Sequence, residues 1–202
     1  MILRKKEFQR QKISIFGKGM KRQSGYVQWV MSMFFVLFLG ILLCAGLQVK
    51  AYRATSLYME DALAASGLAS AIIDVQEYGC SHNLIIADAE EAYERYCVAL
   101  RGNLQLNEQW EGTNKTLVSG KVTVENYTVY NVADGVVTVY CIGQDGAPVI
   151  MQESVGGCVA PNGVPVVSTA IYSEISFPVE GMFGVQTVAR KGKLVDIVAE
   201  ME

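Results

Sequence analysis

Few side chains in this sequence have the types and spacing that catalysis requires. The one histidine, His82, lies in a segment with turn character, between Ser81 and Asn83. Histidine-assisted nucleophilic catalysis needs a nucleophile and a group that orients the ring, and no such pair can be assembled here. A group of acids is explained by its place at the start of a helix, where carboxylates favour the dipole; these are Asp88, Glu90, Glu91 and Glu94. The sequence therefore predicts no enzyme and no catalytic residue.

Metal ions and cofactors have no recognisable site either. The cysteines include no Cys-x-x-Cys pair, which makes a zinc site a poor explanation of them. No glycine-rich phosphate-binding loop is present. A basic N-terminal segment can indicate nucleic-acid binding, but beside an apolar helix membrane topology explains the charge more simply. We expect no metal, no cofactor and no nucleic-acid partner.

Four of the five cysteines lie in the C-terminal three-quarters of the chain, at Cys80, Cys97, Cys141 and Cys158. An even number in an oxidising compartment permits two disulfides, with three possible pairings. We favour Cys80–Cys97 and Cys141–Cys158, because the members of each pair are 17 residues apart. Closing loops of that size stabilises a fold by about 3 kcal/mol in the chain-entropy model. The alternative is that all four are buried, reduced thiols.

An uncharged segment of 27 residues lies between Arg22 and Lys50. About 20 helical residues, at a rise of about 1.5 Å each, cross the roughly 30 Å hydrocarbon layer of a bilayer. The apolar core Val27–Val49 has 23 residues and can span with some tilt. Because every backbone group in lipid must be satisfied within the segment, the sequence predicts a transmembrane α-helix.

Charge on the two sides of this segment predicts its orientation. The first 24 residues hold eight Lys/Arg against Glu7, a net charge of +7. The residues after Val49 hold nine Lys/Arg and 19 Asp/Glu, a net charge of −10. Basic flanks remain in the cytoplasm. We therefore expect a single-pass protein of the cell membrane, with a cytoplasmic N-terminus and an extracytoplasmic C-terminal domain.

Three kinds of processing have to be considered for such a segment. A secretory signal has an apolar core of about 7–15 residues and a small-x-small cleavage site; this core is longer, and no Ala-x-Ala follows it. A lipoprotein signal would modify Cys44, but Leu43 stands where a small residue is needed, so Cys44 is better explained as a small apolar side chain. The third is cytoplasmic cleavage between Gly25 and Tyr26. Gly25 as an ordinary helix-entry glycine is the alternative.

The helical pattern continues beyond Lys50 and predicts one helix from about Tyr26 to about Glu77. Its expected buried stripe recurs at spacings of three, four and seven and consists of Leu57, Ala64, Leu68, Ala71, Ile72 and Val75. The segment 50–78 is also rich in small residues, which let helices approach closely; the candidate packing positions are Ala62, Ala65, Ser66, Gly67, Ser70 and Ala71. These either pack on the protein's own sheet or also pack against partner subunits.

The remainder of the chain predicts an α+β domain. A helix is expected from Asp88 to Arg101, with Asp88 and Glu91 as a capping box and Gly102 after its end. From Leu117 the apolar period changes to two, which predicts an antiparallel sheet that buries one face on the helices. Apolar residues change parity between Val124 and Tyr127, which indicates a bulge. Hairpin turns are expected at Asp134-Gly135, Asp145-Gly146 and Lys191-Gly192, and a long loop is expected over residues 155–165.

A short basic leader, a glycine, an apolar helix that continues as a stem, and a mainly β head resemble the architecture of type IV pilins and pseudopilins. Ser24-Gly-Tyr-Val-Gln-Trp-Val most resembles the start of TadE-like minor pilins of Tad/Flp systems. There a glycine shortly precedes a Val-Glu-aromatic stretch, which reads Val27-Gln28-Trp29 here. The resemblance covers residues 18–75 by motif and the rest by architecture.

The resemblance implies a pilin-like fold and cleavage after Gly25 by a prepilin peptidase. It also implies that the freed helix, beginning at Tyr26 with Gln28 and Trp29 near its start, packs with other subunits. In the family a glutamate near the new N-terminus pairs with a neighbour's amine. Here Val30 occupies that position and the nearby Gln28 is neutral, which suits a minor or priming subunit better than a major pilin.

The sequence thus predicts four segments: a cytoplasmic leader (1–25), a transmembrane helix (26–49), a helical stem (50–78) and an extracytoplasmic α+β head (79–202). The expected function is that of a minor, TadE-like structural or assembly subunit of a Tad-type pilus or related secretion apparatus. Its partners would be the membrane, a prepilin peptidase, and copies of itself or other pilin-like subunits. The alternative is a membrane-anchored extracytoplasmic sensor or binding protein that does not assemble.

Overall fold

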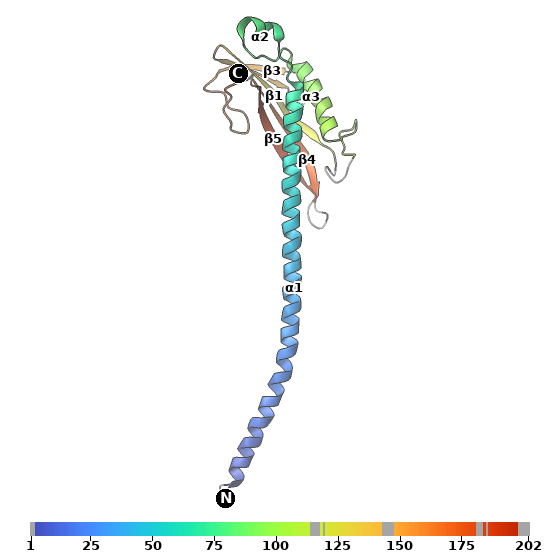
Figure 1. Cartoon of the computed structure of the whole chain (residues 1–202), viewed down its shortest axis with the longest axis vertical. Coiled ribbons are helices and arrows are strands. Elements are labelled where there is room, and N and C mark those ends of the chain that lie inside the picture. Colours follow the sequence, from blue (N-terminus) through green and yellow to red (C-terminus); the bar gives the residue numbers. More distant parts are fainter. Residues whose placement is uncertain are drawn as a thin grey trace. The chain divides into compact units, whose positions relative to one another are not determined.

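The computed structural model describes residues 3–113, 118, 120–142, 148–180, 184 and 186–197. The chain divides into two compact units, Met1–Ala51 and Tyr52–Glu202. The second unit is called the head domain here. The longest helix, α1 (Leu3–Ser70), begins in the first unit and ends in the second (Figure 1). We use "stem" for its last part, Tyr52–Ser70.

The first unit consists of the N-terminal part of α1. The helix begins at Leu3, earlier than the expected start near Tyr26, so the basic leader is helical too. The large side chains of the uncharged segment are exposed, as at Phe34 (62%), Phe35 (63%) and Leu43 (68%). A helix that is apolar on all sides and covered by no described part of its own chain has the length and composition of a membrane-spanning helix.

The stem ends earlier than the sequence pattern predicts. Helix α1 stops at Ser70, and a separate short helix, α2 (Val75–Ser81), follows instead of a continuous helix to Glu77. Between them Ile73 forms a bridge with Ile86, which an unbroken helix could not make. Asp74 then caps α2, because its carboxylate accepts hydrogen bonds from two backbone amides of the first turn. The expectation of one continuous helix to about Glu77 was therefore wrong.

Helix α3 (Ala89–Asn103) confirms the second expected helix. Asp88 is its N-cap and accepts hydrogen bonds from the amides of Glu90 and Glu91 at 2.8 and 3.1 Å. The Glu91 side chain binds Arg95 rather than completing the reciprocal half of a capping box. Helix α3 turns its buried residues, which are Ala92, Tyr96 and Leu100, toward the sheet.

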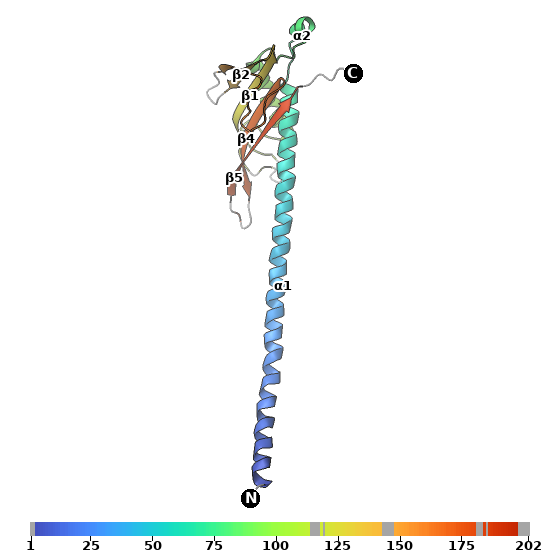
Figure 2. The same cartoon turned by 90° about the vertical axis from the view of Figure 1, so that its left-hand side faces the viewer.

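The sheet has five antiparallel strands in the order β3-β2-β1-β4-β5 (Figures 1 and 2). The strands are β1 (Thr123–Ala133), β2 (Val136–Ile142), β3 (Pro148–Ser154), β4 (Ala170–Glu180) and β5 (Gln186–Asp196). The predicted bulge is confirmed, since the β1–β4 register shifts between Val124 and Asn126. The predicted turn at Asp134-Gly135 is also confirmed, with positive φ at both residues. The expected turn at Asp145-Gly146 lies outside the described residues.

The expected hairpin turn at Lys191-Gly192 was wrong. Strand β5 continues through both residues and pairs with β4 along its whole length. A Cβ atom on residue 192 would collide with the Tyr172 hydroxyl and the adjoining ring atoms, so the absence of a side chain at Gly192 lets Tyr172 lie across the strand. This glycine therefore makes room for a neighbouring aromatic ring and does not reverse the chain.

Both faces of the sheet are covered, whereas one buried face was expected. The larger core lies between the sheet and the helices α1 and α3, and its largest fully buried members are Tyr96, Tyr127, Met59, Leu63 and Leu100. A smaller core lies on the other face, where the loop after β3 covers β1, β2 and β4; it includes Cys158, Ala160, Val166, Tyr130, Val139 and Tyr172. The expected loop over residues 155–165 is thus a packed layer.

Candidate functional site

The residues that could have done chemistry have structural roles. His82 is the C-cap of α2, with φ of 60° in the left-handed region, and its backbone N–H donates to the Tyr78 carbonyl. Among the described residues, no group of His, Cys, Asp or Glu side chains could hold a metal ion. The acids at the start of α3 are exposed, and one of them, Glu91, forms a 2.7 Å ion pair with Arg95.

All five cysteines are free thiols. Cys141 and Cys158 both belong to the smaller core, and Thr128 Oγ1 lies 3.7 Å from Cys141 Sγ. Cys80 is exposed on α2, whereas Cys97 is half-buried on α3. Burial raises the pKa of the Cys97 and Cys158 thiols above the ordinary value. Both are therefore poor nucleophiles near neutral pH.

Most small residues of the stem pack against the head's own sheet. Ala62, Ser66, Gly67 and Ser70 are buried, while Ala65 is exposed and Ala71 half-buried. A Cβ atom on Gly67 would lie 3.3 Å from Val195 Cγ2, so the stem backbone approaches β5 closely at this point. The small side chains thus explain how the stem fits its own head.

Two serines of the same stem face make buried polar contacts. Ser66 Oγ accepts a hydrogen bond from Asn103 Nδ2 at 2.9 Å and donates to the Ala62 carbonyl. Ser70 Oγ donates to the Gly67 carbonyl at 2.8 Å, so the Tyr127 hydroxyl, 3.0 Å away, is the donor in their contact. These bonds fix the stem to α3 and β1.

The opposite face of the stem is apolar and exposed. Leu57 and Leu68 are 64% and 57% exposed, and Ala65 between them is exposed as well. Two of the six residues in the stripe expected to be buried, Leu57 and Leu68, lie here. Val75 beyond the stem is 79% exposed, and Ala64, Ala71 and Ile72 are half-buried. Asp61 is the one charged residue among the exposed positions 61, 65 and 68. The expectation that the whole stripe is buried was therefore wrong, and Leu57 and Leu68 form an apolar face that no described residue of the chain covers.

A charged clamp joins the stem to strand β5. The Glu60 carboxylate lies 2.7 Å from Lys193 Nζ and 3.0 Å from Lys191 Nζ. Lys191 Nζ also donates to Ser56 Oγ at 3.3 Å. The hydrogen bonds from Lys193 and Lys191, with the charge of both lysines, lower the pKa of Glu60 to about 2. Glu60 is thus ionised across the physiological pH range.

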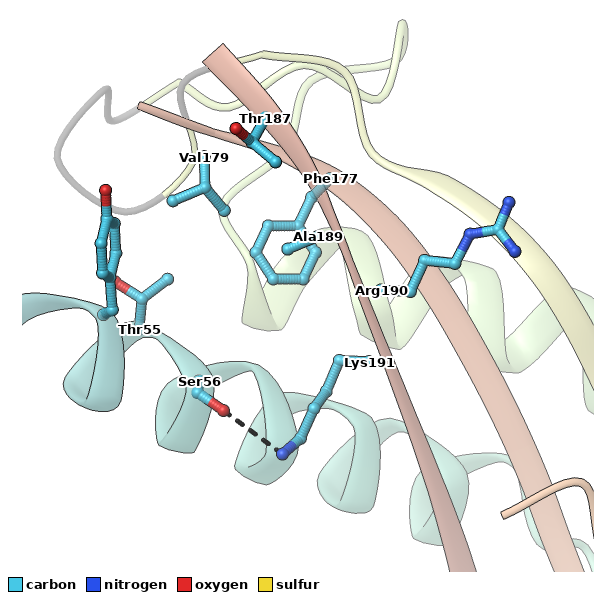
Figure 3. Close-up of a pocket in the computed structure, with 9 residues that line it drawn as sticks. Thr55, Ser56, Phe177, Val179, Thr187, Ala189, Arg190 and Lys191 are labelled. Atoms are coloured by element: carbon cyan, nitrogen blue, oxygen red, sulfur yellow. Dashed lines mark hydrogen bonds between the residues drawn. The ribbon is translucent and has the colours of Figure 1, made fainter. Parts of the chain in front are cut away.

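Next to this clamp is a groove of about 350 Å³ between the stem and the β4–β5 hairpin (Figure 3). Apolar atoms of Phe177, Val179 and Ala189 form its wall on the sheet. Thr55, Ser56 and Tyr52 line it from the stem, and the Tyr52 hydroxyl donates to the Glu180 carbonyl at 3.4 Å. Lys191 reaches from β5 toward Ser56, whereas the Arg190 side chain points away from the stem.

The sequence interpretation missed both the clamp and the groove. Their residues come from segments more than 120 positions apart, so no local spacing indicates them. The available signal was the charge of three residues. Lys191 and Lys193 are two positions apart and so lie on the same face of a strand, and Glu60 interrupts an otherwise apolar helix face.

The residues near the candidate cleavage site are placed on α1. Tyr26 and Trp29 are 72% and 64% exposed, and Gln28 is exposed as well. A Cβ atom on Gly25 would meet no atom within 4 Å. Among the described residues, none therefore comes close enough to position 25 to exclude a side chain there.

Comparisons with protein-family models, with curated proteins and with solved structures find no match for this chain. The function is therefore inferred from the apolar segment, the stem and the groove.

Proposed function

We propose that this protein is a membrane-anchored, minor pilin-like subunit that assembles laterally through α1. In this proposal the apolar segment spans the membrane and the stem contributes a second contact surface outside it. The head is presented on the extracytoplasmic side. The pilin-like and TadE-like character of the proposal rests on the order of leader, Gly25, apolar helix and mainly β head.

The observation that carries the proposal is the uncovered face of the stem. An isolated soluble domain gains free energy by burying side chains such as Leu57 and Leu68, at about 25 cal/mol per Å² of apolar surface. Here both remain exposed on the side of the helix away from the sheet. An exposed apolar face, here interrupted by Asp61, is typical of an interaction surface. A second apolar helix, from a copy or a related subunit, fits this face.

The neutral start of the helix limits the kind of subunit. Gln28 can form a hydrogen bond in a packed helix bundle but cannot neutralise a neighbour's amine, and a buried amine without a countercharge is costly. We therefore place the chain among accessory or priming subunits rather than the repeating subunit of a long filament.

Site-specific photo-cross-linking tests the lateral contact. A benzophenone amino acid at Leu57 or Leu68 is expected to form ultraviolet-dependent adducts in the source organism's membranes. The partners, identified by mass spectrometry, should be copies of this chain or other short proteins with one N-terminal apolar helix. The matched control is Val98, an exposed apolar residue (63%) on α3. Equal yields at all three positions, or adducts with lipid only, would contradict the proposal.

Processing is tested separately. Co-expression with a prepilin peptidase is expected to reduce the intact mass by that of residues 1–25, and Gly25→Leu should block the change. An unchanged mass would favour the second candidate, a membrane-anchored binding protein. The groove beside Tyr52 and Lys191 is the observation that favours that candidate.

A further inference from the structure

Strand β3 forms one edge of the sheet. It pairs with β2 on one side, and no backbone hydrogen bond among the described residues reaches residues 149–153 from the other side. The outer edge of a strand presents a row of N–H and C=O groups that can pair with another strand. The edge of β3 is therefore a place where a strand from another chain can extend the sheet.

The two edges of the sheet differ in their protection. Strand β5, at the other edge, carries Arg190, Lys191 and Lys193, and the stem is attached beside it. Charged side chains, lysine above all, and a covering helix are common ways to prevent strand addition. Strand β3 lacks such cations, and Glu153 is the one charged residue in the sequence between positions 145 and 174.

The side chains of β3 are apolar on both faces of the sheet. Met151 pairs with Val139 of the smaller core, so Met151 and Val149 lie on that face. Ile150 pairs with Tyr140, which packs against the larger core. The three β3 side chains are 47–60% exposed. A strand added outside β3 would therefore continue both cores, and it needs apolar side chains at odd and even positions alike.

We propose that this strand is β3 of a second copy, in an antiparallel pair with two-fold symmetry. Pairing centred on Ile150 places it opposite the partner's Ile150 on one face. On the other face Val149 lies opposite the partner's Met151, and Met151 lies opposite the partner's Val149. Every exposed apolar position of the strand then meets an apolar position, and such cross-strand pairs are what stabilises a sheet. A two-fold dimer is also the commonest symmetric assembly.

Charge is compatible with a copy as the partner. The chain after Val49 has a net charge of −10, so two heads repel each other unless they meet where little charge is present. In the register centred on Ile150 the two Glu153 carboxylates fall at opposite ends of the pair. They are about 20 Å apart, for six residues at about 3.4 Å each, which is more than the Debye length of about 8 Å at physiological salt.

The strand pair involves seven residues from each copy. A pair of this length is by itself smaller than the standard interface of about 1,200–2,000 Å², so we expect a reversible dimer whose population depends on concentration. The contact uses a different surface from the exposed stem face with Leu57 and Leu68. It therefore stands or fails separately from lateral assembly through α1.

Disulfide cross-linking of the full chain in detergent tests the register, in a background that lacks the two exposed thiols (Cys44→Ser, Cys80→Ser). Ile150→Cys is expected to give a covalent dimer on mild oxidation, because the two substituted residues face each other at the two-fold axis. Val149→Cys or Met151→Cys alone should give at least about fivefold less dimer. Identical residues at these positions are diagonal neighbours about 7–8 Å apart, too far for a disulfide without backbone movement.

A mixture of Val149→Cys and Met151→Cys chains should cross-link, with the linked peptides identified by mass spectrometry. The matched control is Val188→Cys, at a 67% exposed apolar position of the opposite edge strand, which should remain monomeric. No dimer from Ile150→Cys, equal yields from the three β3 variants, or as much dimer from Val188→Cys would overturn the proposal. In membranes of the source organism, adducts of Ile150→Cys with a different protein instead of a copy would overturn it too.

A lysine at the centre of the edge tests the contact without a cysteine there. Ile150→Lys, introduced into both chains of the Val149→Cys and Met151→Cys mixture, should abolish their cross-link, because two like charges would lie directly opposite. Val188→Lys should leave it unchanged. Both positions are exposed, so the thermal unfolding curves should stay close to that of the parent chains. A cross-link that survives Ile150→Lys would overturn the proposal, and so would loss of the Leu57 photo-cross-link in that variant, since the two surfaces would then be one interface.

Discussion

Glu60 Oε1 lies 2.7 Å from Lys193 Nζ and joins the stem to the edge strand β5 across 133 positions of sequence. The other oxygen of the same carboxylate contacts Lys191 at 3.0 Å. This clamp lies between the groove and the close approach of Gly67 to Val195, so it fixes the stem along the β4–β5 hairpin. The position of the uncovered stem face follows from this attachment.

Replacing Glu60 by glutamine should make the thermal stability of the head depend less on pH in the acidic range. The lysines lower the pKa of Glu60 from 4.5 to about 2. A carboxylate with a lowered pKa stabilises the fold above its unfolded pKa, and this contribution is lost as pH falls from about 4.5 to about 2. In thermal unfolding of the full chain in detergent, wild type should be more stable than Glu60→Gln at pH 7. The difference should vanish near pH 2.

The matched control is Glu108→Gln, at an exposed position of the loop after α3. It should match wild type throughout the titration. A constant difference between wild type and Glu60→Gln from pH 7 down to pH 2 would show that the clamp does not titrate as described.

Removing the Tyr127 hydroxyl should weaken the attachment of the stem's end. This group donates to Ser70 Oγ at 3.0 Å in a buried site. Tyr127→Phe is expected to cost about 1 kcal/mol in free energy of unfolding, which lowers Tm by about 2–4 °C for a domain of this size. Ser70→Ala should also destabilise, and the double variant should lose less than the sum. Additive losses would mean that the two hydroxyls do not interact.

Leucine should destabilise the head at one stem position, Gly67, and leave its stability almost unchanged at another, Ala65. Gly67→Leu places atoms against Val195 and should destabilise the head by about 1–3 kcal/mol. Ala65→Leu lies on the exposed face and should change the free energy of unfolding by less than about 0.5 kcal/mol. Only Ala65→Leu is therefore a clean probe of subunit contact. It should alter the Leu57 cross-link while the thermal unfolding curve stays the same, and an unfolded Ala65→Leu head would refute the assigned faces.

Oxidation should join Cys141 to Cys158 before it joins Cys80 to Cys97. The first two thiols share the smaller core, whereas Cys80 is exposed and Cys97 is half-buried on a different helix. Closing this loop should stabilise the head by about 3 kcal/mol. Peptide mapping without reduction, after alkylation of free thiols, should find the Cys141–Cys158 peptide pair and alkylated Cys80. A Cys80–Cys97 pair as the first product would contradict this order.

Local signals in the sequence were sufficient for several elements. Asp88 indicates the start of α3 because its carboxylate can accept hydrogen bonds from two backbone amides of the first helical turn. After Val124 the apolar residues change from even to odd positions. In a regular strand alternate residues stay on one face, so this change indicates the bulge. Asp134-Gly135 forms the turn because both residues tolerate positive φ.

Tertiary contacts decided the rest. The stem has two apolar faces, so its periodicity could not show which face the sheet covers; the small residues around Gly67 fit β5, and Leu57 and Leu68 do not. Lys191-Gly192 looked like a turn, but the ring of Tyr172 explains the glycine within a continuous strand. The groove depends on Lys191 lying beside Ser56, which no pattern within one segment can indicate.

Labelling of Cys80 in intact cells tests most directly the claim that one apolar helix holds the basic N-terminus inside and the head outside. Cys80 is exposed on α2, while Cys158 is buried and Cys44 lies within the apolar segment. After a membrane-impermeant reductant, a membrane-impermeant maleimide should label the chain without lysis, and Cys80→Ser should abolish most of the label. Labelling of Cys80 that requires lysed cells, or a full-length chain found in the soluble fraction without detergent, would contradict the account.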